Sequence, residues 1–275
     1  MRLRISHLTS YRYQAPANSV IQILRLTPRS HDNQYVARWH IDISADCRLD
    51  QHEDAFGNIT HTFAADGPFT ELAIRAEGEV ETRDSQGIMH STVERFPASL
   101  YLRETLLTKP DAGIAEFAAA CRDSHEDDPL EVLHLMLDRL HGEMIFDTDP
   151  THAATTAAEA FSLKRGVCQD FTHIFIAASR QIGIPARYIS GYFRRTDGVE
   201  KQDAGHAWAE AFVPEVGWIA FDPTNGICAT ESHVRVAMGL DYLSAAPVRG
   251  TCYGGRGEAL AVAISVAQAA QQIQN

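Results

Sequence analysis

Two stretches of the sequence decide the fold: RGVCQDFTHIFIAASRQIG at residues 165–183 and GHAWAEAFVPEVGWIAFDPT at residues 205–224. In the first, Gly166 interrupts one helical pattern, and an apolar run with helical spacing follows, so a helix is predicted from about 168 to 182. The second holds two apolar strand patterns, HAWAEAFV and GWIAFD, separated by turn residues 214–217. The sequence therefore predicts a helix that begins at Cys168, and an antiparallel hairpin.

The hairpin brings two chemically active side chains together. His206 begins one strand and Asp222 ends the next, so antiparallel pairing places them side by side. A carboxylate beside an imidazole fixes its tautomer and stabilises its protonated form. A cysteine at a helix N-terminus meets unpaired N–H groups and the positive end of the dipole, which favour the thiolate. Cys168, His206 and Asp222 are predicted as nucleophile, base and orienting acid; the alternatives are a structural cysteine, a surface histidine and a turn cap.

These motifs resemble those of the bacterial transglutaminase-like cysteine peptidases. The matching tracts are GVCQDF, GIPARYISGY, HAWAEAFVPEVGWIAFDPT and DYLSAAPVRG, together with HLTSYRYQAPANSVIQILRLTPR and DAFGN nearer the N-terminus. The resemblance implies a papain-like α+β catalytic core with Cys168 as nucleophile, His206 as base and Asp222 as orienter. It also implies that an N-terminal β module precedes this core.

The rest of the chain supports such a two-part organisation. Alternating apolar residues at 35–43 and 69–82, with a turn signal at Gly57 and Asn58, predict a module of short antiparallel strands, arranged as a sandwich or barrel. Residues 259–275 also alternate like a strand. We expect an α+β fold with an antiparallel β module over residues 1–95 and a transglutaminase-like catalytic domain over residues 96–275.

Helix signals appear only after the β-rich first third. Asp111, Asp128 and Thr156 each stand before a helical pattern, and Pro129 and Glu131 strengthen the second of these starts. The helix that follows Thr156 is expected to end at Gly166.

Composition excludes several classes of partner and cofactor. The 275 residues include 24 Lys and Arg against 36 Asp and Glu, a net charge of −12. This field repels phosphate backbones and anionic lipid, so neither nucleic acid nor a membrane is an expected partner. The five cysteines show no CxxC spacing and the histidines no HExxH, so no metal and no other cofactor is expected. Arg2 and Arg4 interrupt any signal-peptide core, which predicts a cytoplasmic protein.

Residues near the triad have weaker assignments. Trp208 is two past His206 and so shares its strand face, where it would either line a substrate cleft or belong to the core. Tyr192 and Gly205 are expected to flank the same cleft. Asp170 lies in the first helical turn, where we expect it to accept backbone N–H groups as a cap.

The favoured function is that of a cysteine hydrolase that cleaves an amide bond in a peptide or protein through a thioester. The backbone N–H of Cys168 is expected to be one oxyanion donor, and a second donor is not assigned. Transfer of the acyl group to an amine and deamidation share the first half-reaction, so both stay open. A non-catalytic peptide-binding module is the alternative of a different class. The sequence does not indicate an oligomeric state.

Overall fold

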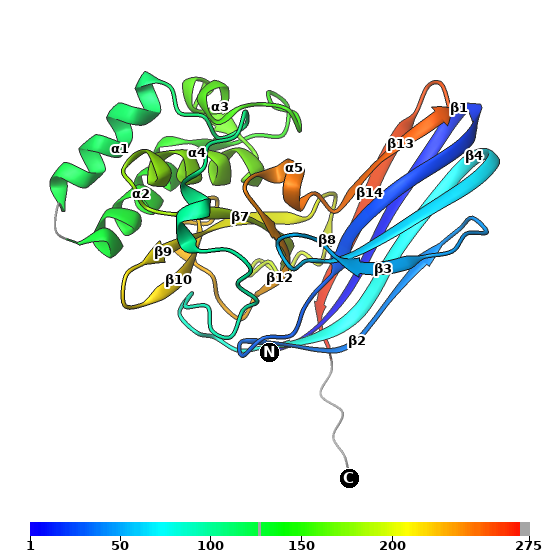
Figure 1. Ribbon diagram of the computed structural model, residues 1–275, viewed down its shortest axis with the longest axis horizontal. Helices are drawn as coiled ribbons and strands as arrows, with labels where there is room; N and C mark the ends of the chain where they lie inside the picture. Colours follow the sequence, from blue (N-terminus) through cyan, green and yellow to red (C-terminus); the bar gives the residue numbers. More distant parts are fainter. Residues whose placement is uncertain (126–127, 270–275) are drawn as a thin grey trace, which may run out of the picture.

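Two antiparallel sheets organise the chain, in a computed structural model that describes residues 1–125 and 128–269. The larger sheet forms one side of the molecule, and the second sheet with most of the helices forms the other (Figure 1). The strands of the larger sheet are β1 (Arg2–Thr27), β2 (Gln34–Ile43), β3 (Asp50–Glu53), β4 (Ile59–Thr82), β8 (Lys201–Gln202), β13 (Val248–Gly254) and β14 (Ala259–Gln268). Their order is β2-β4-β1-β14-β8; β3 pairs with β4, and β13 pairs with β1.

The first third differs from the expected sandwich or barrel of short strands. β1 and β4 are 26 and 24 residues long, and they pair with each other along most of their lengths. Register shifts after Arg12, Ala17 and Leu24 let these strands continue where short ones separated by turns were expected. The module is therefore one long sheet.

The larger sheet takes strands from both ends of the chain. β14 pairs with β1 from Leu3↔Gln268 to Arg12↔Ala259, and β13 pairs with the second half of β1. The expected division into residues 1–95 and 96–275 therefore does not describe this sheet, because residues 248–268 belong to it. Alternation in a terminal segment predicts a strand but does not reveal its partner.

The second sheet and its helices form the core around the predicted site. The strand order is β11-β10-β9-β7-β12, with every neighbouring pair antiparallel. The strands are β7 (Ala186–Phe193), β9 (His206–Val213), β10 (Gly217–Asp222), β11 (Ile227–Cys228) and β12 (His233–Gly239). The helices are η1 (Ala98–Leu102), α1 (Ala112–Ser124), α2 (Pro129–Glu143), α3 (Ala157–Leu163), α4 (Cys168–Gln181) and α5 (Tyr242–Ala245).

Three predicted helix starts are confirmed by their hydrogen bonds. The Asp111 carboxylate accepts from the N–H of Ile114 at 2.9 Å, and the Asp128 carboxylate accepts from the N–H of Leu130 at 2.9 Å. Thr156 forms a capping box with Glu159 at the start of α3. Such caps satisfy N–H groups that the first helical turn leaves unpaired.

The end of α3 was predicted wrongly. The helix stops at Lys164, which adopts φ 54° in the left-handed region, and not at Gly166. Gly166 lies in β6 (Arg165–Gly166), which pairs in parallel with β5 (Ile145–Phe146). A Cβ at Gly166 would lie 2.5 Å from an oxygen of Asp170, so the glycine is needed for close packing against α4.

Helix α4 is buried against strand β9. Ala207, Ala209 and Ala211 alternate along β9 and belong to the same hydrophobic core as Ile174 and Phe175 of α4. These small side chains let the helix approach the sheet closely. Among the described residues, no helix is long and apolar enough to cross a bilayer.

Gly191 is the residue of β7 that faces His206 of β9 in the sheet register. A Cβ there would lie 2.1 Å from the carbonyl oxygen of Val234 and 2.7 Å from the Trp208 ring. We expect Gly191→Ala to lower the free energy of unfolding by about 1–3 kcal/mol, the usual cost of overpacking, in urea denaturation. The control is Gly142→Ala, at an exposed site in α2 with no atom within 4 Å, which should be neutral or stabilising by up to about 1 kcal/mol. Equal stability of the Gly191 variant and the wild type would contradict this packing argument.

Candidate active site

Cys168 is the first residue of α4 and lies at one end of the second, five-stranded sheet, called the core sheet from here on. Its Sγ is 4.0 Å from the carbonyl oxygen of Gly205, the residue before His206. The Cys168 side chain also helps to raise the pKa of the His206 imidazole. The structure therefore brings the predicted nucleophile to the predicted base.

His206 and Asp222 are joined as the hairpin argument predicts. The Nε2 of His206 donates to Oδ2 of Asp222 at 2.6 Å, with the His206 side chain one-tenth exposed and Asp222 fully buried. Because Nε2 is engaged by the carboxylate, Nδ1 is the ring nitrogen left for the thiol. This is the arrangement in which an acid orients a base toward a nucleophile.

The electrostatics of the pair follow from burial and charge. Burial by itself lowers the pKa of His206, but the adjacent Asp222 carboxylate and the Cys168 side chain outweigh it and raise the pKa to about 10. Burial would raise the pKa of Asp222, yet its bonds to His206 and His233 hold that pKa well below its usual range. At neutral pH the site therefore holds an imidazolium beside an ionised carboxylate.

His233 and Asn225 also bind Asp222, and neither was predicted. His233 donates from Nε2 to Oδ2 of Asp222 at 3.1 Å, and Asn225 donates from Nδ2 to the same oxygen at 2.6 Å. The backbone N–H groups of Thr224 and Asn225 donate to Oδ1, each at 3.2 Å. His233, like His206, stands at the first residue of an apolar strand pattern, and this was a signal in the sequence that it lies near the site. What the sequence lacked was the position of that strand in the sheet.

His206, Asp222 and His233 also come close enough together to raise the question of a metal ion. The Nδ1 of His233 accepts from the backbone N–H of Thr230 at 3.0 Å, which places the ring proton on Nε2. Burial lowers the pKa of His233, so the ring is neutral and this Nε2 has no free lone pair for a metal. The three groups therefore fit a hydrogen-bonded acid better than a metal site.

Asp170 caps α4 as predicted. Its Oδ2 accepts from the N–H of Val167 at 2.8 Å and from Oγ1 of Thr151 at 2.7 Å. Burial raises the pKa of this carboxyl. The contact joins the segment before the nucleophile to the loop that carries Thr151.

Two of the expected cleft residues lie elsewhere. Trp208 is 1% exposed and packs against the imidazoles of His206 and His233, so it belongs to the core, the second of its two expected roles. Tyr192 is buried against the larger sheet, where its hydroxyl lies 3.0 Å from Nδ1 of His7. Strand alternation shows which residues share a face, but not which face another layer covers. Gly205 lies beside Cys168, and its place at a substrate cleft stays a prediction.

Comparisons with known proteins show the family to which the chain belongs. The chain matches the model of the bacterial transglutaminase-like N-terminal region over residues 3–81 and that of the transglutaminase-like superfamily over residues 117–223. An uncharacterised protein of Mycobacterium leprae is 32% identical over 270 residues, which cover 93% of this chain and 94% of that protein. This chain therefore belongs to the transglutaminase-like superfamily, which confirms the resemblance seen in its sequence.

A solved structure shows the fold, and another relative matches a shorter part of the chain. A solved protein from Cytophaga hutchinsonii, named for an inferred cysteine protease activity, superposes with a TM-score of 0.76 at 17% identity, covering 100% of this chain and 92% of that one. This match shows the fold alone. A protein-glutamine gamma-glutamyltransferase of Pseudomonas aeruginosa is 31% identical over 113 residues, which are 34% of this chain and 16% of that enzyme.

The charge balance at the site can be measured by NMR titration of the His206 ring nitrogens. In the wild type we expect His206 to titrate with a pKa of about 10, and in Asp222→Asn to titrate below about 6.5, because burial then acts without the carboxylate. Asp197→Asn, which removes an exposed acid, is the control and should leave His206 unchanged. An unchanged His206 titration in Asp222→Asn would show that this carboxylate does not hold the imidazolium.

The same shifts predict how stability depends on pH. The His206 pKa is raised on folding, so its contribution is complete below about pH 6.5 and declines as pH rises through about 10. The Asp222 pKa is lowered, so its contribution is present above about pH 4 and is lost in acid. The stability advantage of the wild type over Asp222→Asn should therefore be largest between about pH 4 and 6.5, in urea denaturation at several pH values. A difference that does not vary with pH would contradict this assignment.

Proposed function

We propose that this protein is a cysteine hydrolase that cleaves an amide bond in a peptide or protein substrate. The observation that carries the proposal is the 2.6 Å bond between His206 and buried Asp222, beside Cys168 at the start of α4. Nucleophilic catalysis by cysteine needs a thiol, a base beside it and an acid that orients the base.

The positions of these side chains support the following reaction. The Cys168 sulfur attacks the substrate carbonyl carbon, and the imidazolium of His206 gives its proton to the departing amine, which leaves an acyl thioester. His206, now neutral, takes a proton from water as the water attacks the thioester and releases the carboxylic acid. Asp222 keeps the ring oriented throughout. The Cys168 N–H has no partner within the helix and serves as one oxyanion donor.

Transfer to an amine is the second candidate. The name of the Pseudomonas aeruginosa relative, a protein-glutamine gamma-glutamyltransferase, favours it over the matching 113 residues. A screen of peptide, glutamine-containing and isopeptide substrates by mass spectrometry, with and without added primary amines, separates the outcomes. Hydrolysis adds water across the bond, deamidation of glutamine adds about one mass unit, and transfer replaces the departing ammonia or amine with the added amine.

Selective alkylation tests whether Cys168 is the nucleophile. All five cysteines are free thiols in the structure; burial raises the pKa of Cys121, and it raises that of Cys228 to about 11. We expect iodoacetamide to label Cys168 at least about tenfold faster than these two at pH 6, because only Cys168 has an imidazolium partner. Peptide mapping gives the rate at each site. Equal rates at Cys168 and Cys121 would exclude an activated thiol.

Substitution separates the roles of the triad members. Cys168→Ala should abolish covalent turnover, whereas Asp222→Ala should lower turnover by about 10- to 1000-fold, because the acid orients the base without exchanging a proton. Activity per folded molecule and the thermal midpoint are measured together. Full activity in a destabilised Asp222→Ala protein would reduce Asp222 to a structural cap.

A further inference from the structure

Strand β12 is an edge strand that is nevertheless buried. Its one neighbour within the core sheet is β7, and six of its seven residues are buried. Buried backbone groups need hydrogen-bond partners, and an open edge leaves them without any. The partners on this edge come from the larger sheet.

Two side-chain amides of the larger sheet bind β12 as another strand would. Gln34 of β2 donates from Nε2 to the carbonyl of Arg235 and accepts at Oε1 from its N–H, both at 2.8 Å. Asn58, directly before β4, makes the same pair of bonds to Met238, both at 2.8 Å. A third bond runs from Oγ1 of Thr82 to the carbonyl of Glu231, just before β12, at 2.5 Å.

The irregularity in β12 makes this binding possible. Along a regular strand, outward-facing backbone groups recur at every second residue. The register of β12 with β7 shifts between Arg235 and Ala237, so the extra residue makes Arg235 and Met238, three apart, both face outward. The side chain of Arg235 is fixed as well, because it donates to both oxygens of buried Glu210.

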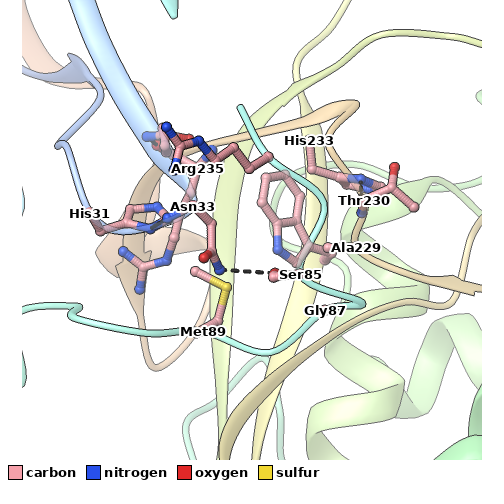
Figure 2. Close-up of a pocket in the computed structure, with 12 residues that line it drawn as sticks. His31, Asn33, Ser85, Gly87, Met89, Ala229, Thr230, His233 and Arg235 are labelled. Carbon is pink, nitrogen blue, oxygen red and sulfur yellow. Dashed lines mark hydrogen bonds between the residues drawn. The ribbon is translucent and has the colours of Figure 1, made fainter. Parts of the chain in front are cut away.

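The first residue of this clamped strand is His233, which holds Asp222. Its Nδ1 accepts from the N–H of Thr230, which leaves the proton on Nε2, and Nε2 donates to Asp222. Figure 2 shows His233 and Thr230 on one side, and His31, Asn33 and Arg235 on the other side, of a small cavity between the two sheets. With a volume of about 30 Å³ the cavity holds roughly one water, so it is not a ligand site.

We propose that the larger sheet is a positioning element of the active site: Gln34 and Asn58 hold β12 where His233 fixes the Asp222 carboxylate toward His206. The inference rests on the proposed function, because it takes Cys168, His206 and Asp222 as the working groups. His233, Gln34 and Asn58 are positioning residues, since none of them touches the nucleophile.

The test is the rate at which iodoacetamide alkylates Cys168 at pH 6.5, measured on the full chain. His233→Phe keeps a ring but removes the donor, and should slow alkylation about tenfold, since a less ordered Asp222 supports the imidazolium less. His233→Gln can still present an N–H near the Nε2 position and should stay within about twofold of wild type. Gln34→Leu and Asn58→Leu should each slow alkylation about two- to fivefold, and together about tenfold.

Leu72→Ala is the matched control for stability. Leu72 of β4 is buried in a hydrophobic cluster formed by residues of the larger sheet. Truncating it destabilises that sheet without removing a bond to β12. Thermal midpoints are recorded for every variant, and rates are compared per folded molecule. Leu72→Ala should alkylate at the wild-type rate despite its lower midpoint.

The outcomes separate this inference from the proposed function. If iodoacetamide alkylates Cys168 of the wild type no faster than the other cysteines, the proposed function fails, and this inference fails with it. Two results with a selectively alkylated wild type would overturn the positioning role alone. One is a wild-type alkylation rate in His233→Phe, and the other is an equal slowing of alkylation in His233→Gln and His233→Phe. If His233→Phe does not fold, the Gln34 and Asn58 variants decide: wild-type rates in both would overturn the proposal.

Discussion

The buried carboxylate of Asp222 is the constraint around which the active site is arranged. Removing a charge from water costs several kcal/mol unless the protein replaces the lost hydration. Here five donors do so: two imidazoles, one amide and two backbone N–H groups. Each of those donors must be held in place, which explains why the surrounding turn, strands and second sheet are so closely packed.

The antiparallel core sheet brings these groups to one edge. β10 ends at Asp222, β9 begins at His206, β7 ends at Phe193 and β12 begins at His233, so four neighbouring strands contribute to one row. Phe193 packs against both imidazoles, with ring centroids 5.2 and 4.6 Å away. Helix α4 then needs only to start at this edge for its first residue to meet His206. The small alanines of β9 allow that close approach.

The larger sheet is tied to this core at both ends of the chain. Its first strand pairs with the last, and Gln34 of β2 and Asn58, directly before β4, supply the side chains that complete the edge of β12. A sheet with this arrangement cannot be treated as an appendage, because removing it would leave the backbone groups of a buried strand unpaired. In this protein its place beside the core has a physical reason, because its side chains satisfy the backbone groups of β12.

The sequence by itself determined the local parts of this protein. Helix caps, the tight turn at 214–217 and the pairing of His206 with Asp222 depend on residues close together in the chain, so their patterns could be interpreted directly. Only the tertiary structure decided that residues 248–268 complete the larger sheet, that the side chains of Tyr192 and Trp208 are buried, and that His233 reaches Asp222. Those outcomes depend on which strands become neighbours and which faces are covered. Long-range packing sets both, and alternation along a single strand carries no record of them.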